Sequence, residues 1–441
     1  LVREASVERG RLFKNAPHLV KNLSFIIPTF NLYDEILYTL GLKFYDLLAG
    51  TLSMGKSKWV SRSFVREKLS NLRSRKISAG VLYHDGQFDD SRLAISLLRT
   101  ADNLGGIAIN YMPIESLVKD SSSNISGVIA RDKETGMEHS INAKVVVNAS
   151  GVFSDSIMEM DKHDHQISIK PSQGIHLVVD SKFMPGEYGL MIPKTNDGRV
   201  LFAVPWHNKI VLGTTDTPVD GISLEPEALE EEIDFILNTA AIYLVKPPKR
   251  EDVLSVFAGL RPLAAPKEGK SKTKEISRSH KIFLSESGLV NIIGGKWTTY
   301  RKMAEDLVNK VEKSFNFKQT KSGTPTLRIH DYKENVDFND PFYIYGNEAQ
   351  EFSGSDDKKL LSEKLNIFDS QVEYALKYEM ARKVEDVLAR RTRALFLDAR
   401  ESMKMAPEVA KQMAVYLDKS DDWVKEQVED YNSLAEKYIL K

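Results

Sequence analysis

The chain has 441 residues, which predicts two or three domains. Hydrophobic residues make up 42% of it and charged residues 28%, as is typical of soluble globular proteins, and the net charge of −1 argues against a nucleic-acid partner held by bulk charge. The absence of cysteine excludes disulfides and thiolate metal sites, and the nine histidines form no HExxH motif, so we expect no metal.

The first residues, "LVREASVERGRLFKNAPHL", have the pattern of a helix already under way, with Pro17 just past its end. We therefore expect the natural N-terminus to lie upstream of Leu1. A second helix is expected over residues 33–49. Its apolar side chains repeat at helical spacing and comprise Ile36, Leu37, Leu40, Phe44, Leu47 and Leu48.

This stripe has two interpretations. The first is a core helix. The second is a helix that lies in the surface layer of a membrane, because the basic segment from Lys56 to Lys76 that follows suits anionic lipid. No apolar run in the sequence reaches the ~18 residues that a membrane span needs.

The next region has the alternation of an α/β layer. We expect a helix over residues 89–106 with Asp89 or Asp90 as its N-cap, a strand over 107–118, and a hairpin that turns at 132–136. The run "KVVVNASG" that follows is typical of a buried parallel strand. In doubly wound sheets ligands bind at the carboxyl ends of such strands.

From residue 169 to 290 the pattern changes to short β runs with polar turns and one helix, which predicts a mostly antiparallel second domain. Residues 326–441 are nearly all helical in pattern. The sequence thus predicts an α/β part, an α+β part and a C-terminal helical domain.

The stretch "LVNIIGGKWTTYRKMAEDLVNKV" carries the clearest chemical signal. An apolar strand ends at Gly294-Gly295-Lys296, and a helix capped by Thr298 or Thr299 follows. Glycines admit a ligand close to the backbone, and the helix start and the lysine both attract negative charge. The spacing is not that of a Walker A loop. A plain strand–turn–helix and an anion or cofactor site both remain open from these residues.

Three further residues are weaker candidates. Arg261 in "AGLRPL" suits phosphate or carboxylate but also an ordinary surface ion pair. His176 in "QGIHLVV" is most simply a core histidine, and Asp216 in "GTTDTP" a turn residue. The Arg390-Arg391-Thr392-Arg393 run is read as a lipid or partner patch or, more simply, as packing and surface charge.

The order of the motifs adds a resemblance. "NASGVFSD", "PSQGIHLVV", "VLGTTDTP", "AGLRPL", "GLVNIIGGKWTTYRKMAED" and "ARRTRALFL" together resemble the FAD-dependent, quinone-linked glycerol-3-phosphate dehydrogenases of bacteria and mitochondria. The resemblance covers essentially the whole chain. The family's GxGxxG segment is not in this sequence, which resembles the family from just after that point.

The resemblance implies a fold and a reaction. It implies a doubly wound, Rossmann-like FAD-binding domain from residues 1–168 and 291–325, a mostly antiparallel substrate domain over 169–290, and a helical domain over 326–441. The implied reaction oxidises sn-glycerol 3-phosphate to dihydroxyacetone phosphate by hydride transfer to FAD, with electrons passed to a membrane quinone. The alternatives are an oxidase that uses O₂ and a non-catalytic fragment of the enzyme.

The resemblance also implies roles. His176, Arg261 and Lys296 are the expected catalytic residues, with His176 as the base. Arg261, Lys296 and Thr299 are expected to bind substrate. The expected cofactor-binding residues are Ser150, Gly151, Gly294, Gly295, Trp297 and Thr298. We further expect peripheral attachment to the cytoplasmic face of a bacterial inner membrane, or alternatively to the mitochondrial inner membrane, and a possible homodimer.

Overall fold

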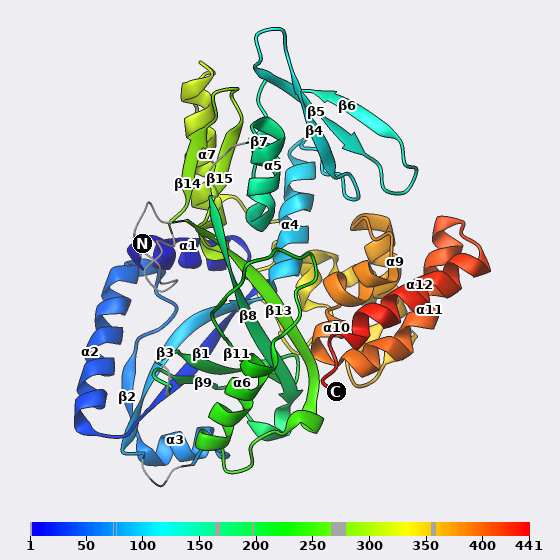
Figure 1. Ribbon diagram of the computed structural model, residues 1–441. Coiled ribbons are helices and arrows are strands. Elements are labelled where there is room, and N and C mark those ends of the chain that lie inside the picture. The colour runs from blue at the N-terminus through cyan, green and yellow to red at the C-terminus, as the bar shows by residue number, and fades with distance from the viewer. Residues whose placement is uncertain are drawn as a thin grey trace.

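The computed structural model describes residues 2–73, 75, 77–163, 168–195, 198–265, 279–353 and 359–441. Its largest sheet has nine strands and occupies the lower half of the molecule (Figure 1). The strands are β1 (Val20–Thr29), β2 (Lys58–Ser61), β3 (Ala79–Phe88), β8 (Ile169–Asp180), β9 (Gly189–Ile192), β10 (Leu201–Trp206), β11 (Lys209–Gly213), β12 (Thr217–Pro218) and β13 (Val253–Ala264).

The strand order is β12-β8-β11-β10-β9-β1-β3-β2, and β13 also pairs with β8. All of these pairings are antiparallel except that of β1 with β9. The core beneath the sheet includes Ile175 and Leu177 of β8 with Ile233 and Ile236 of α6 (Glu230–Tyr243). The predicted mostly antiparallel sheet with one helix is therefore present.

A smaller sheet holds the predicted parallel strand. In it β7 (Val147–Asn148) pairs parallel with β15 (Val290–Ile293), and β14 (Lys281–Leu284) pairs antiparallel with β15. Helices α4 (Asp90–Asn103), α5 (Ser154–Asp161) and α7 (Tyr300–Ser314) belong to this α/β part. Asp89 is the N-cap of α4, since its carboxylate accepts from the Arg92 amide at 2.8 Å.

The segment between α4 and β7 departs from one expectation. The hairpin of β5 (Ile125–Arg131) and β6 (Glu138–Asn142) turns at residues 132–136 as predicted, and β4 (Ile114–Lys119) pairs with β5. Residues 107–113 were expected to continue that strand but form no strand. Apolar spacing indicates the capacity to form a strand, whereas a strand exists only where another pairs with it.

Strand pairing also divides the chain differently from the predicted domain boundaries. Residues 20–88 supply three strands to the large sheet, although the sequence grouped them with the α/β part. Residues 281–290 pair within the small sheet, although they were grouped with the antiparallel domain. Both differences arise because pairing partners far apart in sequence leave no local pattern.

Helix α2 (Leu32–Ala49) forms where a helix was predicted, but it is not a core helix. Tyr38 and Leu42 pack against the large sheet. The opposite side leaves Ile36, Leu37, Leu40, Phe44 and Leu47 between 47% and 73% exposed. The helix stands at one edge of the molecule (Figure 1). Periodicity correctly indicated one apolar face, but that face meets solvent in this chain.

The C-terminal region is mostly helical, as predicted, and lies beside β13 (Figure 1). Its elements are α8 (Ala349–Ser353), β16 (Leu360–Ser362), β17 (Ile367–Phe368), α9 (Asp369–Tyr378), a π-helix (Asp386–Arg391), α10 (Ala394–Leu397), α11 (Ala399–Leu417) and α12 (Asp421–Glu436). The helices of this region are interrupted at Met380 and Arg393, whose φ angles are 53° and 63°.

The remaining elements are short apart from the first helix. They are α1 (Val2–Asn15), α3 (Arg62–Lys68) and the 3₁₀ turns η1 (Gly50–Leu52), η3 (Gly151–Phe153), η4 (Ser181–Phe183), η5 (Arg250–Asp252), η7 (Trp297–Thr299), η8 (Thr324–Thr326) and η9 (Tyr343–Glu348). Within the described residues, no helix has the length and apolar character needed to cross a membrane.

Candidate active site

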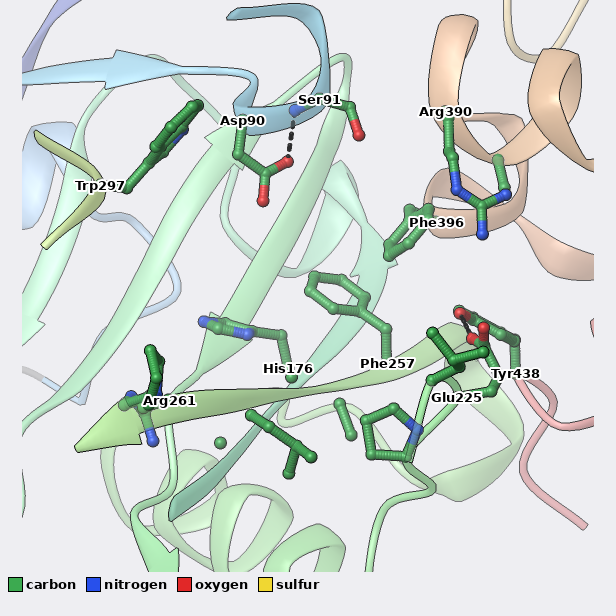
Figure 2. A pocket seen from close by; sticks show the side chains of 18 of the residues that line it. Asp90, Ser91, His176, Glu225, Phe257, Arg261, Trp297, Arg390, Phe396 and Tyr438 are labelled. Carbon is green, nitrogen blue, oxygen red and sulfur yellow. Dashed lines mark hydrogen bonds between the residues drawn. The ribbon is translucent and has the colours of Figure 1, made fainter. Parts of the chain in front are cut away.

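Three of the predicted residues meet in one cavity of about 740 Å³. His176 comes from β8, Arg261 from the neighbouring strand β13, and Lys296 from the turn after β15. Figure 2 shows His176 and Arg261 above these strands, with Trp297 across from them. The cavity therefore joins a group able to take a proton with two cations.

The turn at Lys296 has the geometry that the glycines indicated. Gly294 and Gly295 adopt φ angles of 73° and 88°, which side chains other than glycine rarely adopt. A Cβ at Gly295 would lie 2.5 Å from Sδ of Met303 on α7. The turn leads through η7 into α7, and Gly295, Lys296 and Trp297 of this segment line the cavity.

His176 is seated by packing. Its ring stacks on Phe257 with centroids 5.1 Å apart, and Phe257 meets Phe396 of α10 edge-on at 4.9 Å. Burial, and to a lesser degree the nearby Arg261 charge, lower the pKa of His176 to about 4. The imidazole is therefore neutral near pH 7 and able to accept a proton.

Arg261 is held by acceptors on two other segments. Its Nη1 donates to the carbonyl of Gln173 at 3.1 Å, and its Nη2 donates to Oγ1 of Thr214 and to the carbonyl of Thr215, both at 3.1 Å. The guanidinium lies over Gly174, where a Cβ would be 2.1 Å from Nη2. Asp216, predicted as a turn residue, lies 3.5 Å from Nη1. Arg261 is thus fixed in place while it lines the cavity.

The predicted cofactor residues gather at one edge of the small sheet. Because β7 and β15 run parallel, Ser150-Gly151 and Gly294-Gly295 both follow the carboxyl ends of their strands. Trp297 and Gly295 also line the cavity.

The predicted residues that do not line that cavity are Ser150, Gly151, Gly294, Thr298 and Thr299. Thr298 is half-buried beside it. Thr299 is buried, and its hydroxyl donates to the Lys296 carbonyl at 3.0 Å. The hydroxyl of Thr299 is thus used within the 3₁₀ turn over residues 297–299, and its role in substrate binding stays a prediction.

The sequence alone did not identify the residues that contact and position His176 and Arg261. Gly174, Gly213 and Phe257 have that role, and the only local signal was a glycine near each candidate in "QGIH" and "VLGTT". The cavity also includes Asp90 of α4 and Arg390 and Arg393 from the C-terminal region. Arg393 pairs with Asp89 and Asp90, both at 3.1 Å, which agrees with the simpler interpretation of that basic run as packing.

Within the described residues, one group of side chains has the chemistry to bind a metal ion, and it lies away from this cavity. His330, Asp331 and Glu348 lie close enough to share an ion. However, Arg99 donates to both oxygens of Glu348, at 2.7 and 3.1 Å, and so already compensates its charge. The prediction of no metal stays a prediction.

Comparisons with known proteins show the family of the chain. Residues 1–301 match the family described as FAD dependent oxidoreductase, and residues 289–424 match the C-terminal domain of alpha-glycerophosphate oxidase. Mitochondrial glycerol-3-phosphate dehydrogenase of Saccharomyces cerevisiae is 34% identical over 94% of the chain and 75% of its own length. The chain belongs to the FAD-dependent glycerol-3-phosphate dehydrogenases.

Two further glycerol-3-phosphate dehydrogenases are similar to the chain. The human mitochondrial enzyme is 35% identical over 97% of the chain, which spans 63% of that relative's length. The glycerol-3-phosphate dehydrogenase of Bacillus halodurans, solved in complex with FAD, superimposes with a TM-score of 0.81 at 27% identity, covering 100% of this chain and 86% of that one. FAD is the cofactor of the family, and the glycine turn before α7 fits the close approach of such a group.

Proposed function

We propose that the chain oxidises glycerol 3-phosphate to dihydroxyacetone phosphate with FAD as the hydride acceptor. The observation that carries this proposal is the convergence of His176, Arg261 and Lys296 on one cavity beside the glycine turn. A substrate with a secondary alcohol and a phosphate needs a base for the first group and cations for the second. When bound, FAD supplies the acceptor for the hydride.

His176 takes the proton of the C2 hydroxyl in this proposal. Its pKa of about 4 leaves the ring neutral at physiological pH, so a nitrogen lone pair is available. The stack on Phe257 holds the ring plane while the proton moves. Arg261 sits within the same cavity and lowers the pKa of His176, so the two groups are electrostatically coupled.

Arg261 and Lys296 bind the phosphate in this proposal. A guanidinium held in place by protein acceptors offers a fixed positive charge to a dianion. Lys296, the N-cap residue of η7, adds a second positive charge to the lining of the cavity. The residues that we propose to hold FAD are Ser150, Gly151, Gly294, Gly295, Trp297 and Thr298.

The proposed electron acceptor is a membrane quinone, reached through peripheral attachment by α2. Phe30 and Trp59 are also exposed, at 41% and 52%, and the indole of Trp59 donates to Glu35 of α2 at 3.0 Å. Basic residues of α3 follow nearby in the chain. An amphipathic helix with basic neighbours is the usual means of binding a lipid surface without crossing it. The mitochondrial names of the relatives favour the mitochondrial inner membrane over the bacterial one.

Anaerobic reduction tests the proposed function. The full chain is mixed with FAD, freed of unbound flavin, and titrated with glycerol 3-phosphate while the visible spectrum is recorded. We expect the flavin absorbance to bleach with glycerol 3-phosphate and to remain with glycerol. Protein that binds flavin but does not bleach would contradict the proposed substrate, and protein that binds none would favour the reading as a non-catalytic fragment.

The same preparation distinguishes the acceptors. We expect reoxidation by a short-chain quinone to be faster than by O₂. Peroxide formed at the rate of substrate oxidation would instead indicate an oxidase. Light scattering of the purified chain checks the homodimer, which stays a prediction.

A further inference from the structure

The acceptors that hold Arg261 share a common support. Two of them are backbone carbonyls, those of Gln173 on β8 and Thr215 after β11. The side chains of the same two residues both donate to the carboxylate of Glu232. Glu232 therefore contacts the residues that hold the guanidinium, without contacting the guanidinium.

Glu232 is a buried hub of hydrogen bonds. It lies in the first turn of α6 and is 2% exposed. Its Oε1 accepts from Oγ1 of Thr215 and of Thr217, both at 2.7 Å. Its Oε2 accepts from Nε2 of Gln173 at 2.8 Å and from the amide of Leu229 at 3.2 Å. A carboxylate removed from water is tolerated where donors replace its hydration, and here four do so.

The direction of these bonds is fixed by their chemistry. The hydroxyl of Thr215 accepts from the Ile175 amide at 3.0 Å, so its proton is free to point toward Glu232. The amide nitrogen of Gln173 and the Leu229 amide can only donate. An ionised carboxylate accepts from all four groups. A glutamine at position 232 would place an NH₂ group against donors on one side.

We propose that Glu232 is a positioning residue for phosphate binding, which acts by fixing Gln173 and Thr215 so that their carbonyls orient Arg261. This inference rests on the proposed function. His176 is seated by different contacts, namely Phe257 and Gly213, so the inference predicts a loss of substrate affinity that exceeds the loss of turnover.

The experiment measures by calorimetry how tightly the full chain binds glycerol 3-phosphate. Three proteins, prepared in the same way, are compared: the wild type, Glu232→Gln and Glu231→Gln. Glu231 is the matched control, since it precedes Glu232 in the same helical turn and is exposed. We expect Glu232→Gln to raise the dissociation constant at least tenfold and Glu231→Gln to leave it within twofold. In steady-state assays of flavin-loaded protein, KM should rise more than kcat falls.

A double-mutant cycle separates positioning from general stability. In the background Arg261→Ala, adding Glu232→Gln should change the dissociation constant by less than twofold, because the group that it positions is gone. Equal loss in both backgrounds, or wild-type affinity in Glu232→Gln, would overturn the inference. A wild type that does not bind glycerol 3-phosphate would overturn the proposed function and this inference with it.

A second variant keeps the test decisive if Glu232→Gln does not fold. Thr217→Val removes one of the four donors, conserves shape, and leaves the contacts of Arg261 intact. We expect a two- to fivefold rise in the dissociation constant with the same dependence on Arg261. Unchanged affinity in a folded Thr217→Val protein would count against the role of Glu232.

Discussion

The ring of His176 lies directly against the backbone of Gly213. The two residues are paired across β8 and β11, and a Cβ at position 213 would be 2.2 Å from Cδ2 of the imidazole. Two atoms cannot approach so closely, so any side chain there moves the ring. The position of the His176 ring therefore depends on the absence of a side chain at Gly213.

Gly213→Ala should displace the imidazole and lower the rate of flavin reduction by an order of magnitude or more. Stopped-flow measurement under anaerobic conditions checks this. Gly221→Ala is the control, since a Cβ there meets nothing within 4 Å. A Gly213→Ala enzyme that reduces flavin at the wild-type rate would mean that the ring position is not critical.

His176→Ala should lower turnover about 10²- to 10⁴-fold, the range that a general base contributes. Flavin content per chain should stay near the wild-type value, because His176 belongs to the large sheet and not to the glycine turn. Absorbance ratios and anaerobic reduction rates measure the two quantities separately. Unchanged turnover would remove His176 from the mechanism.

Arg261→Ala should raise KM for glycerol 3-phosphate about 10- to 100-fold, as expected for a charged contact of ~1.5–3 kcal/mol. Gly174→Ala should act in the same direction, since a Cβ would occupy the place of Nη2. Arg250→Ala, which breaks a surface ion pair with Glu230, is the control. Steady-state kinetics of the three variants measure these KM values. A wild-type KM in Arg261→Ala would argue against phosphate binding by Arg261.

Acid should destabilise the fold through two histidines. Burial lowers the pKa of His18 and of His176 from 6.5 to about 4. Below pH 6.5 the unfolded chain takes up protons that the folded chain does not. The contribution of these histidines to the free energy of unfolding is therefore fully present above pH 6.5 and is lost as the pH falls from 6.5 to 4. For His18 this loss reaches about 3 kcal/mol at pH 4.

Urea unfolding at several pH values measures this dependence. His18→Leu should flatten the slope between pH 6.5 and 4, whereas His139→Gln at an exposed position of β6 should leave it unchanged. An unaltered slope in His18→Leu would show that His18 does not contribute.

Leu40→Glu combined with Phe44→Glu should abolish binding to vesicles that contain anionic lipid, because both changes place charge on the exposed face of α2. Val415→Glu, at an 86% exposed position on α11, is the matched control and should bind normally. Sedimentation with vesicles at moderate salt checks the difference. Equal sedimentation of both proteins would exclude α2 as the attachment surface.

Local features of this protein were readable from its sequence. The cap at Asp89, the hairpin at residues 132–136 and the strand–glycine–helix at Lys296 all formed as expected. Each depends on backbone angles and hydrogen bonds within a few residues, so neighbouring side chains suffice to determine them. The ordered motifs also identified the family and its cofactor.

Only the tertiary structure decided which strands share a sheet, which side of α2 meets solvent, and what holds Arg261. The support of Arg261 joins Gln173, Thr215 and Glu232, which lie on separate elements. Their contacts come from the pairing of β8 with β11, β12 and β13 and from the packing of α6 on β8. Such contacts depend on the free energy of the whole fold, and no residue pattern in one segment records them.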